Sequence, residues 1–229
     1  EIPLRLVGSE MCIRDRYLKG KKNMVHALNN INLKIDDRET VAIIGESGAG
    51  KSTLLHIMSC IDNFDGEYYL DNIDINKLSE SKKSKLRSSK IGIVLQDFAL
   101  IDDFTVFENV MTPLYFNKKI KDKKGSVMRA LKKTGIASLK AKKVSQLSGG
   151  QKQRVAISRA LVTSPEYIFA DEPTGSLDSK TSEEIVKMLF DLNRNGITII
   201  IVTHNLDIAN KCQRVIEIKD GNIIEDNCS

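Results

Sequence analysis

The chain has 229 residues, of which 41% are hydrophobic and 28% are charged, a balance typical of a soluble globular protein with one large domain or two lobes that share a core. Its longest apolar stretch, residues 197–202, is too short to cross a bilayer, so a role at a membrane requires a partner protein. The net charge of +5 comes from dispersed lysines without interleaved aromatic residues, which disfavours a nucleic-acid groove, and the four cysteines lack metal-site spacing and fit a reduced cytosolic chain.

The first predicted elements alternate between strands and a helix. Residues 28–35 alternate apolar and polar side chains, as a half-buried strand does. The apolar run TVAIIG at 40–45 ends in a glycine, as a buried parallel strand would, and a helix with apolar residues at helical spacing follows from residue 51. Residues 64–75 predict short antiparallel strands with Asp-Gly and Asp-Asn as turn signals, and residues 90–96 predict another buried strand.

The middle of the chain differs, because residues 105–150 contain helical stretches joined by Lys-rich connections. These stretches cover 106–115 and 124–134, and they indicate a helical lobe inserted into an α/β chain. The remaining predicted elements are a strand over 167–171, a helix over 180–194, a strand over 197–203 and a hairpin over 214–226 with Asp220-Gly221 at its turn. We therefore expect an α/β fold: a core of mainly parallel sheet, an antiparallel β subdomain and an inserted α-helical subdomain at about 97–160.

The sequence GESGAGKST at residues 45–53 fits the phosphate-loop pattern G-x-x-x-x-G-K-[ST] and lies between a predicted buried strand and a predicted helix. Its glycines allow several backbone N–H groups to point at phosphate oxygens, and the helix start adds the positive end of its dipole. Lys51 has the reach to contact the β- and γ-phosphates, and the Ser52 hydroxyl is a ligand for Mg²⁺. A glycine turn without function is the alternative, which the flanking elements disfavour.

Two carboxylates, Asp171 and Glu172, follow a largely apolar strand. Ligands of open parallel sheets gather at the carboxyl ends of the strands. Asp171 is therefore predicted to hold Mg²⁺, directly or through water, and Glu172 to polarise an attacking water. A solvated turn is the alternative, and so apolar a strand disfavours it.

Many classes of protein contain a phosphate loop, and the sequence LSGGQKQRVAISRAL at residues 147–161 distinguishes between these classes. Ser148 is a natural helix N-cap, and Gly149 and Gly150 allow a close approach of the backbone at the helix start. The motif predicts a second phosphate-binding helix end, far along the chain from the first.

With these motifs the chain resembles the ATP-binding-cassette (ABC) ATPases over residues 17 to about 226, and the motifs follow the family order. The resemblance implies these roles: ATP binding by Tyr17, which would stack on adenine, and by Gly45, Glu46, Ser47, Gly48, Ala49, Gly50, Lys51, Ser52 and Thr53; Mg²⁺ binding by Ser52, Gln96 and Asp171; catalysis by Glu172, His204, Gln96 and Lys51; contact with a partner chain's ATP by the signature Ser148, Gly149, Gly150 and Gln151; and a D-loop aspartate, Asp178.

The resemblance also implies how such a chain works. Two copies pair head to tail, so that ATP on one phosphate loop is covered by the signature of the other. Glu172 would activate the attacking water, and His204 would hold the γ-phosphate and that water in place. Gln96 would connect Mg²⁺ or the water to the helical lobe, which grips a membrane permease at the cytoplasmic face of the membrane.

The segments 99–116 and 171–185 are similar to one exporter branch, which handles lipoproteins, macrolides and antimicrobial peptides. An ABC ATPase that regulates a membrane complex without transport, as in cell division, is the alternative. A DNA-repair or translation ABC protein would show a coiled-coil insertion or tandem cassettes, and neither fits in this length. Cargo contacts lie in the permease, so the sequence names no cargo.

The resemblance stops at Tyr17, and the residues before it continue neither a strand pattern nor a helical face. Residues 6–16 match, residue for residue, the translation of a DNA string that resembles a transposon-based sequencing-library adapter. We therefore expect residues 1–16 to be a non-native, adapter-derived segment in place of the native N-terminal strand, and residues 17–229 to form a single ABC ATPase domain.

Overall fold

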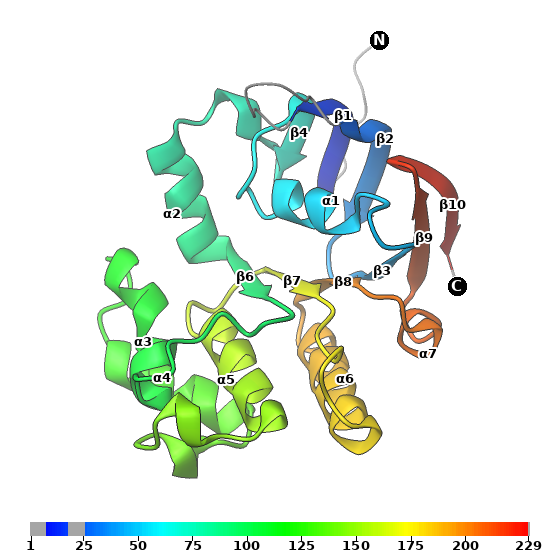
Figure 1. Ribbon diagram of the computed structural model, residues 1–229. Coiled ribbons are helices and arrows are strands. Elements are labelled where there is room, and N and C mark those ends of the chain that lie inside the picture. Colours follow the sequence, from blue (N-terminus) through cyan, green and yellow to red (C-terminus); the bar gives the residue numbers. More distant parts are fainter. Residues whose placement is uncertain (1–7, 18–25, 229) are drawn as a thin grey trace.

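The computed structural model describes residues 8–17 and 26–228, and of residues 8–17, 26 and 228 it describes the backbone alone. A six-stranded sheet in the order β10-β9-β3-β8-β7-β6 forms the centre of the fold, with β10 antiparallel and all other neighbours parallel (Figure 1). Its strands are β3 Thr40–Ile44, β6 Ile91–Val94, β7 Tyr167–Asp171, β8 Thr198–Val202, β9 Arg214–Lys219 and β10 Asn222–Cys228. This order confirms the mainly parallel α/β core.

Both faces of this sheet are covered, which explains the continuous apolar runs. Successive residues of a strand point to opposite faces. Val41 and Ile43 of β3 therefore pack into one core cluster, which lies against helix α1 (Lys51–Met58) and the antiparallel sheet, whereas Ala42 packs into a second cluster among the helices on the other face. A strand with core on both sides has no solvent face for polar residues.

A four-stranded antiparallel sheet in the order β2-β1-β4-β5 lies over α1 (Figure 1). Its strands are β1 Gly8–Tyr17, β2 His26–Asp36, β4 Asp65–Leu70 and β5 Ile73–Asp74. Only one of the two expected turns forms. Asp71 and Asn72 make the β4–β5 turn with φ of 50° and 61°, whereas Gly66 lies inside β4 and pairs with Ile13.

The backbone of residues 8–17 forms β1 between β2 and β4, although the sequence of this segment predicts no strand. Pairing on both edges satisfies the backbone N–H and C=O groups of the segment, and that does not depend on alternating side chains. The adapter origin of residues 1–16 concerns their codons and stays a prediction.

The helical subdomain contains α3 (Val106–Phe116), α4 (Lys123–Lys133) and α5 (Gly149–Leu161), which pack on one another and confirm the two helical stretches expected at 106–115 and 124–134 (Figure 1). Of these, α5 also packs on β6 of the core. The other helices are α2 Glu80–Lys90, α6 Ser179–Arg194 and α7 Leu206–Ala209, with short 3-10 turns at Ile75–Lys77, Ala137–Leu139 and Val144–Gln146. Within residues 8–17 and 26–228, none of the helices is both long and apolar enough to cross a membrane.

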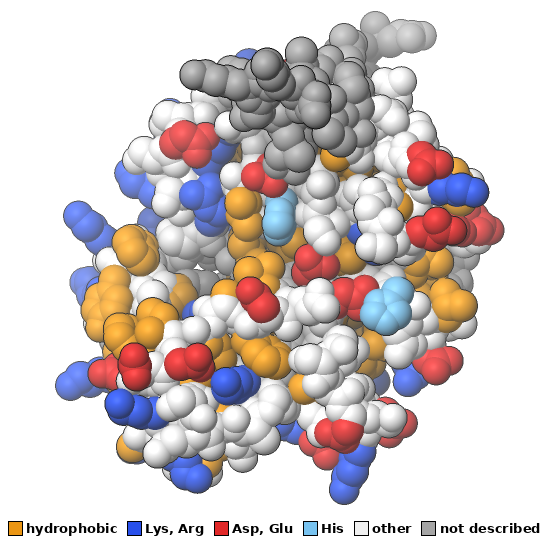
Figure 2. Space-filling view, viewed as in Figure 1, with side chains coloured by type: hydrophobic (Ala, Val, Ile, Leu, Met, Phe, Trp, Pro, Cys, Tyr) orange, Lys and Arg blue, Asp and Glu red, His pale blue; other side chains and the backbone are white. Residues whose placement is uncertain are grey.

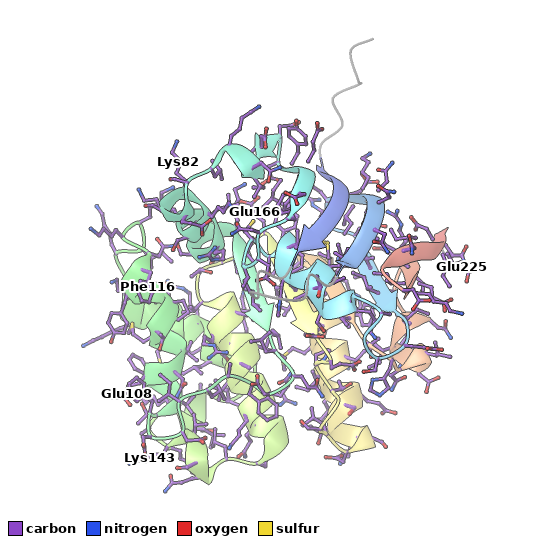
Figure 3. All side chains as sticks on the ribbon, turned by 45° about the horizontal axis from the view of Figure 1, so that its top comes forward. Lys82, Glu108, Phe116, Lys143, Glu166 and Glu225 are labelled. Carbon is purple, nitrogen blue, oxygen red and sulfur yellow. The ribbon has the colours of Figure 1, made fainter. Side chains whose placement is uncertain are left out.

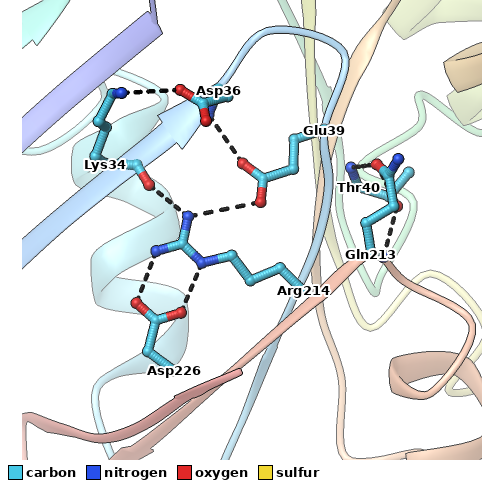
Figure 4. Close-up of polar contacts among 7 residues, drawn as sticks. All are labelled: Lys34, Asp36, Glu39, Thr40, Gln213, Arg214 and Asp226. Carbon is cyan, nitrogen blue, oxygen red and sulfur yellow. Dashed lines mark hydrogen bonds and ion pairs between the residues drawn. The ribbon is translucent and has the colours of Figure 1, made fainter. Parts of the chain in front are cut away.

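Arg214 at the start of β9 ties the C-terminal hairpin to the antiparallel sheet (Figure 4). Its Nε and Nη2 donate to the two carboxylate oxygens of Asp226 at 2.6 and 2.7 Å, and its Nη1 donates to the carbonyl O of Lys34 on β2 at 2.7 Å. Glu39 lies 3.5 Å from the same guanidinium. The two-pronged Arg–carboxylate geometry fixes β10 relative to β2, beside the start of β3, where Val41 pairs with Arg214.

Candidate active site

The phosphate loop connects β3 to α1, as the sequence predicts, and its backbone requires glycine. Gly45, Gly48 and Gly50 have φ of 145°, 83° and 105°, and Gly50 is the N-cap of α1. A Cβ on Gly45 would lie 2.1 Å from the carbonyl O of Ile218. The loop therefore packs directly on the β9–β10 hairpin, and it lies at the positive end of α1, which favours an anion.

Lys51 lies folded over the loop. Its Nζ donates to the carbonyl O of Gly45 at 2.7 Å and of Glu46 at 2.8 Å. Phosphate oxygens in the loop would be stronger acceptors for this ammonium than neutral carbonyls are, because a bond between two charged groups is stronger. The lysine is thus held at the position where a nucleotide phosphate would meet it.

Asp171 ends β7 beside the loop and makes a hydrogen bond with the Ser52 side chain. Burial raises the pKa of Asp171, and the bond with Ser52 and the nearby His56 act in the opposite direction. A carboxylate that is partly desolvated in this way gains from a cation. Two oxygen donors of the kind that Mg²⁺ prefers therefore lie side by side.

Glu172 adopts a left-handed backbone with φ of 43°, which turns the chain away from β7 and aims its side chain at the residues that follow β8. Its carboxylate Oε1 accepts from the backbone N–H of His204 at 3.0 Å and lies 2.7 Å from Nδ1 of that ring. The hydroxyl of Thr203 lies 3.4 Å from Oε2. The sequence paired Glu172 with His204 only through family order, and the structure places them in contact.

These residues surround one cleft with a volume of about 420 Å³. It is lined by Ala27, Gly45, Ser47, Gly48, Gly50, Lys51, Ser52, Thr53, Gln96, Asp171, Glu172, Val202 and His204. Glu46 and Ala49 belong to the loop without lining the cleft. The side chain of Tyr17 lies outside the described part of the structure, so its stacking on adenine stays a prediction.

The signature residues do not line this cleft. Ser148 caps α5, its Oγ accepting from the N–H of Gln151 at 3.4 Å while its own N–H donates to Gln151 Oε1 at 3.1 Å. Ser148 and Gly149 are exposed. A single chain thus holds its phosphate loop and its signature apart, which suits a signature that acts on another chain's ligand.

Asp178 caps α6 and accepts from the N–H and the hydroxyl of Thr181 at 3.0 and 2.6 Å. The hydrogen bond from the Thr181 hydroxyl is the main reason why the pKa of Asp178 is lowered. The same Thr181 approaches the signature, since a Cβ on Gly150 would lie 2.4 Å from its Cγ2. Glycine at position 150 therefore allows α5 to pack on the start of α6.

Two polar residues of α5 that the sequence reasoning missed also contact active-site loops. Gln153 Nε2 donates to the carbonyl O of Pro173, next to Glu172, at 2.6 Å. Arg159 donates to the carbonyls of Phe98 and Ala99, just beyond Gln96. The only sequence signal for them is a polar side chain among the apolar positions of a helix.

The chain is similar in sequence to a known protein family and to individual proteins. Residues 28–175 match the family model described as ABC transporter. The macrolide export ATP-binding/permease protein MacB of Mannheimia succiniciproducens is 44% identical over 93% of this chain and 33% of its own length, and the uncharacterized ABC transporter ATP-binding protein YvrO of Bacillus subtilis is 44% identical over 93% and 94%. The chain therefore spans about a third of the length of the macrolide exporter.

A solved structure is similar over nearly the whole chain. It is a dimeric post-hydrolysis state of the ATP-binding cassette MJ0796 from Methanocaldococcus jannaschii, bound to ADP and Pi. The TM-score is 0.88 at 40% identity, and the match covers 96% of this chain and 98% of that one.

Proposed function

The chain belongs to the ABC transporter family and is an ATPase, and we propose that it powers a separate membrane permease that exports or extracts a peptide, a lipoprotein or an antimicrobial compound. One observation carries this proposal: the phosphate loop, Asp171 and Glu172 meet in one cleft, and the signature that the family requires faces elsewhere. An ATPase built from half-sites is suited to coupling hydrolysis with the closing and opening of a larger assembly.

In the proposed reaction the chain's own groups supply positioning and charge. The loop N–H groups and Lys51 bind the β- and γ-phosphates. Ser52, Asp171 and Gln96 would hold Mg²⁺, which neutralises phosphate charge when bound. Glu172 takes a proton from the attacking water. His204, which contacts the Glu172 carboxylate, orients that water toward the γ-phosphate.

We further propose that the working form is a head-to-tail homodimer. Exposed Ser148 and Gly149 at the start of α5 are available to a second copy's γ-phosphate. The dimeric state of the archaeal relative supports this arrangement.

We assign the binding of the proposed permease to an apolar groove of about 420 Å³. Ile91 and Ile93 of β6 and Pro113 and Phe116 of α3 contribute to its walls. Phe116 is 73% exposed and the adjacent Tyr115 is 64% exposed. Hydrophobic side chains gather on the side of the molecule where α3 lies (Figure 2), and Phe116 lies at the outer edge of the molecule (Figure 3). Exposed aromatic rings beside an apolar groove favour a protein-binding surface, which would hold the chain at the cytoplasmic face of a membrane.

The names of relatives support an exporter, since one is a macrolide export protein, but that protein is about three times longer than the matched region. We therefore do not assign the cargo of that protein to this chain. The neighbouring gene is the place to look for the permease.

The test is co-expression of the chain with the membrane protein encoded beside it. We expect the two to co-purify and the permease to stimulate ATP hydrolysis. Phe116→Glu should abolish both effects and leave the basal rate of the soluble chain unchanged, whereas Ile224→Glu, at a 54% exposed apolar residue of β10, should abolish neither. Failure to co-purify with any multi-span partner would contradict the proposal, and a partner that is activated without releasing substrate would support a regulator instead.

A further inference from the structure

Helix α5 begins with the signature and runs between the helical subdomain and the core, packing on both α3 and β6. Its residue Gln153 is 1% exposed, in the second turn behind Ser148. The amide Nε2 donates to the carbonyl O of Pro173 at 2.6 Å. Because Pro173 directly follows Glu172, one hydrogen bond joins the signature helix to the loop that carries the proposed base.

The orientation of the Gln153 amide follows from chemistry. Its partner is a carbonyl, so the NH₂ group must face Pro173. The other amide atom, Oε1, has no hydrogen-bond partner within the described part of the chain. Burying an unpaired oxygen is unfavourable, and an apolar side chain at this position would avoid that cost. The glutamine is therefore explained by its bond to Pro173 and not by packing.

The loop that Gln153 holds is under local constraint. Glu172 has a positive φ of 43°, a conformation that is unfavourable for a residue with a side chain. The Glu172 N–H donates to the carbonyl O of Val202 at 2.9 Å, which anchors the loop on the β8 side. Gln153 anchors the opposite side of the loop, on α5. The direction of the Glu172 carboxylate thus depends on both anchors.

We propose that Gln153 is a positioning residue for Glu172, through which the signature helix of a chain controls the base in that chain's own active site. The inference rests on the proposed function, in which the signature contacts the ATP of a second copy. When the start of α5 engages that ATP, Gln153 carries the movement of the helix to Pro173 and so to Glu172. ATP bound at one site of the dimer thereby controls the position of the catalytic base at the other site.

The experiment measures steady-state hydrolysis by the full chain with ATP and Mg²⁺. Gln153→Met keeps the length of the side chain and removes both polar atoms. We expect kcat to fall about tenfold to a hundredfold while KM for ATP changes less than about threefold, because misplacement of a base affects the transition state and not ATP binding. Ser158→Ala is the matched control: Ser158 is also buried on α5, but its hydroxyl lies 2.6 Å from that of Thr134 in the helical subdomain. Its kcat should stay within about twofold of wild type.

A second measurement separates positioning from folding. In a Glu172→Gln background, adding Gln153→Met should lower the residual rate less than about twofold, because the carboxylate that it orients is already gone. An equally large loss in that background, an unchanged kcat in Gln153→Met, or the same loss in Ser158→Ala would each overturn the inference. If Gln153→Met does not fold, Gln153→Asn keeps an amide that is one methylene too short, and an unchanged kcat there would also overturn it. Wild-type turnover in the same assay shows that the ATP site assembles whichever way Gln153 behaves, and co-purification with the permease tests the proposed function separately.

Discussion

Gly50 lies at the junction of the phosphate loop and α1, with φ of 105°, and a Cβ there would be 2.5 Å from the carbonyl O of Ala27. We predict that Gly50→Ala destabilises the fold by about 2 kcal/mol or more, from left-handed strain plus this clash, and weakens ATP binding at least about tenfold. Chemical denaturation and a fluorescent-nucleotide titration measure the two effects.

Gly48 provides the control, because its φ is 83° but a Cβ there would meet no atom within 4 Å. Gly48→Ala should therefore cost only the conformational strain, about 1 kcal/mol. Equal losses in the two variants would mean that the close approach to Ala27 is unimportant.

Among single residues, the sequence predicted those that belong to a motif and missed those that contact segments far away in the chain. The phosphate loop, Asp171 and Glu172 follow predicted strands, and the edge of a parallel sheet brings such residues together. Gln153 and Arg159 bond to carbonyls 20 and about 60 residues away in the chain. No local pattern indicates that contact, because it depends on how α5 packs.

Helix α3 begins with a capping box that carries a titratable group. The Glu108 carboxylate accepts from the N–H and the hydroxyl of Thr105, both at 2.7 Å. The backbone hydrogen bond is the larger cause that lowers the pKa of Glu108 below its ordinary value of 4.5. A lowered pKa in the folded state stabilises the fold above the ordinary value, and this contribution is lost as the pH falls through the folded value.

We therefore predict that Glu108→Gln lowers the Tm near pH 7, and that the difference from wild type narrows as the pH falls below 4.5. Thermal unfolding followed by circular dichroism over this pH range measures it. Glu183→Gln is the control, since the exposed side chain of Glu183 on α6 makes no hydrogen bond within the described part of the chain, and its Tm difference should stay near zero. A difference for Glu108→Gln that persists at low pH would exclude the charge of Glu108 as the cause.

Among the elements, those with a clear period were predicted and those without one were not. Residues 82–90 are rich in lysine and show no clear apolar period, and they form most of α2, which buries Lys83 and Leu86. The long lysine stem covers apolar surface while its ammonium lies 3.1 Å from Oδ1 of Asn63. Strand β1 forms because its backbone pairs with a neighbouring strand on each edge. The alternation of side chains along a sequence does not indicate such pairing.

The whole molecule contains every motif of the proposed reaction but not a complete site. The cleft with Lys51 and Glu172 opens on one part of the surface, and Ser148 at the start of α5 does not line it. A second cleft, of about 610 Å³, continues from Glu172 and His204 past Gly175 and Leu177 to the start of α6. Surfaces of this kind around an open site suit the approach of a second copy.

If closure of two copies assembles the site and hydrolysis reopens it, a chain that binds ATP without cleaving it must stay dimeric. We predict that Glu172→Gln loses at least about 99% of turnover, which corresponds to a rise of about 2.7 kcal/mol in the barrier, and sediments as a dimer with ATP and as a monomer without it. Adding Ser148→Arg, which places a bulky side chain at the start of α5, should return this variant to a monomer in the presence of ATP. Full turnover by Glu172→Gln would show that another group is the base, and an ATP-bound dimer that tolerates Ser148→Arg would show that the two copies meet through some other surface.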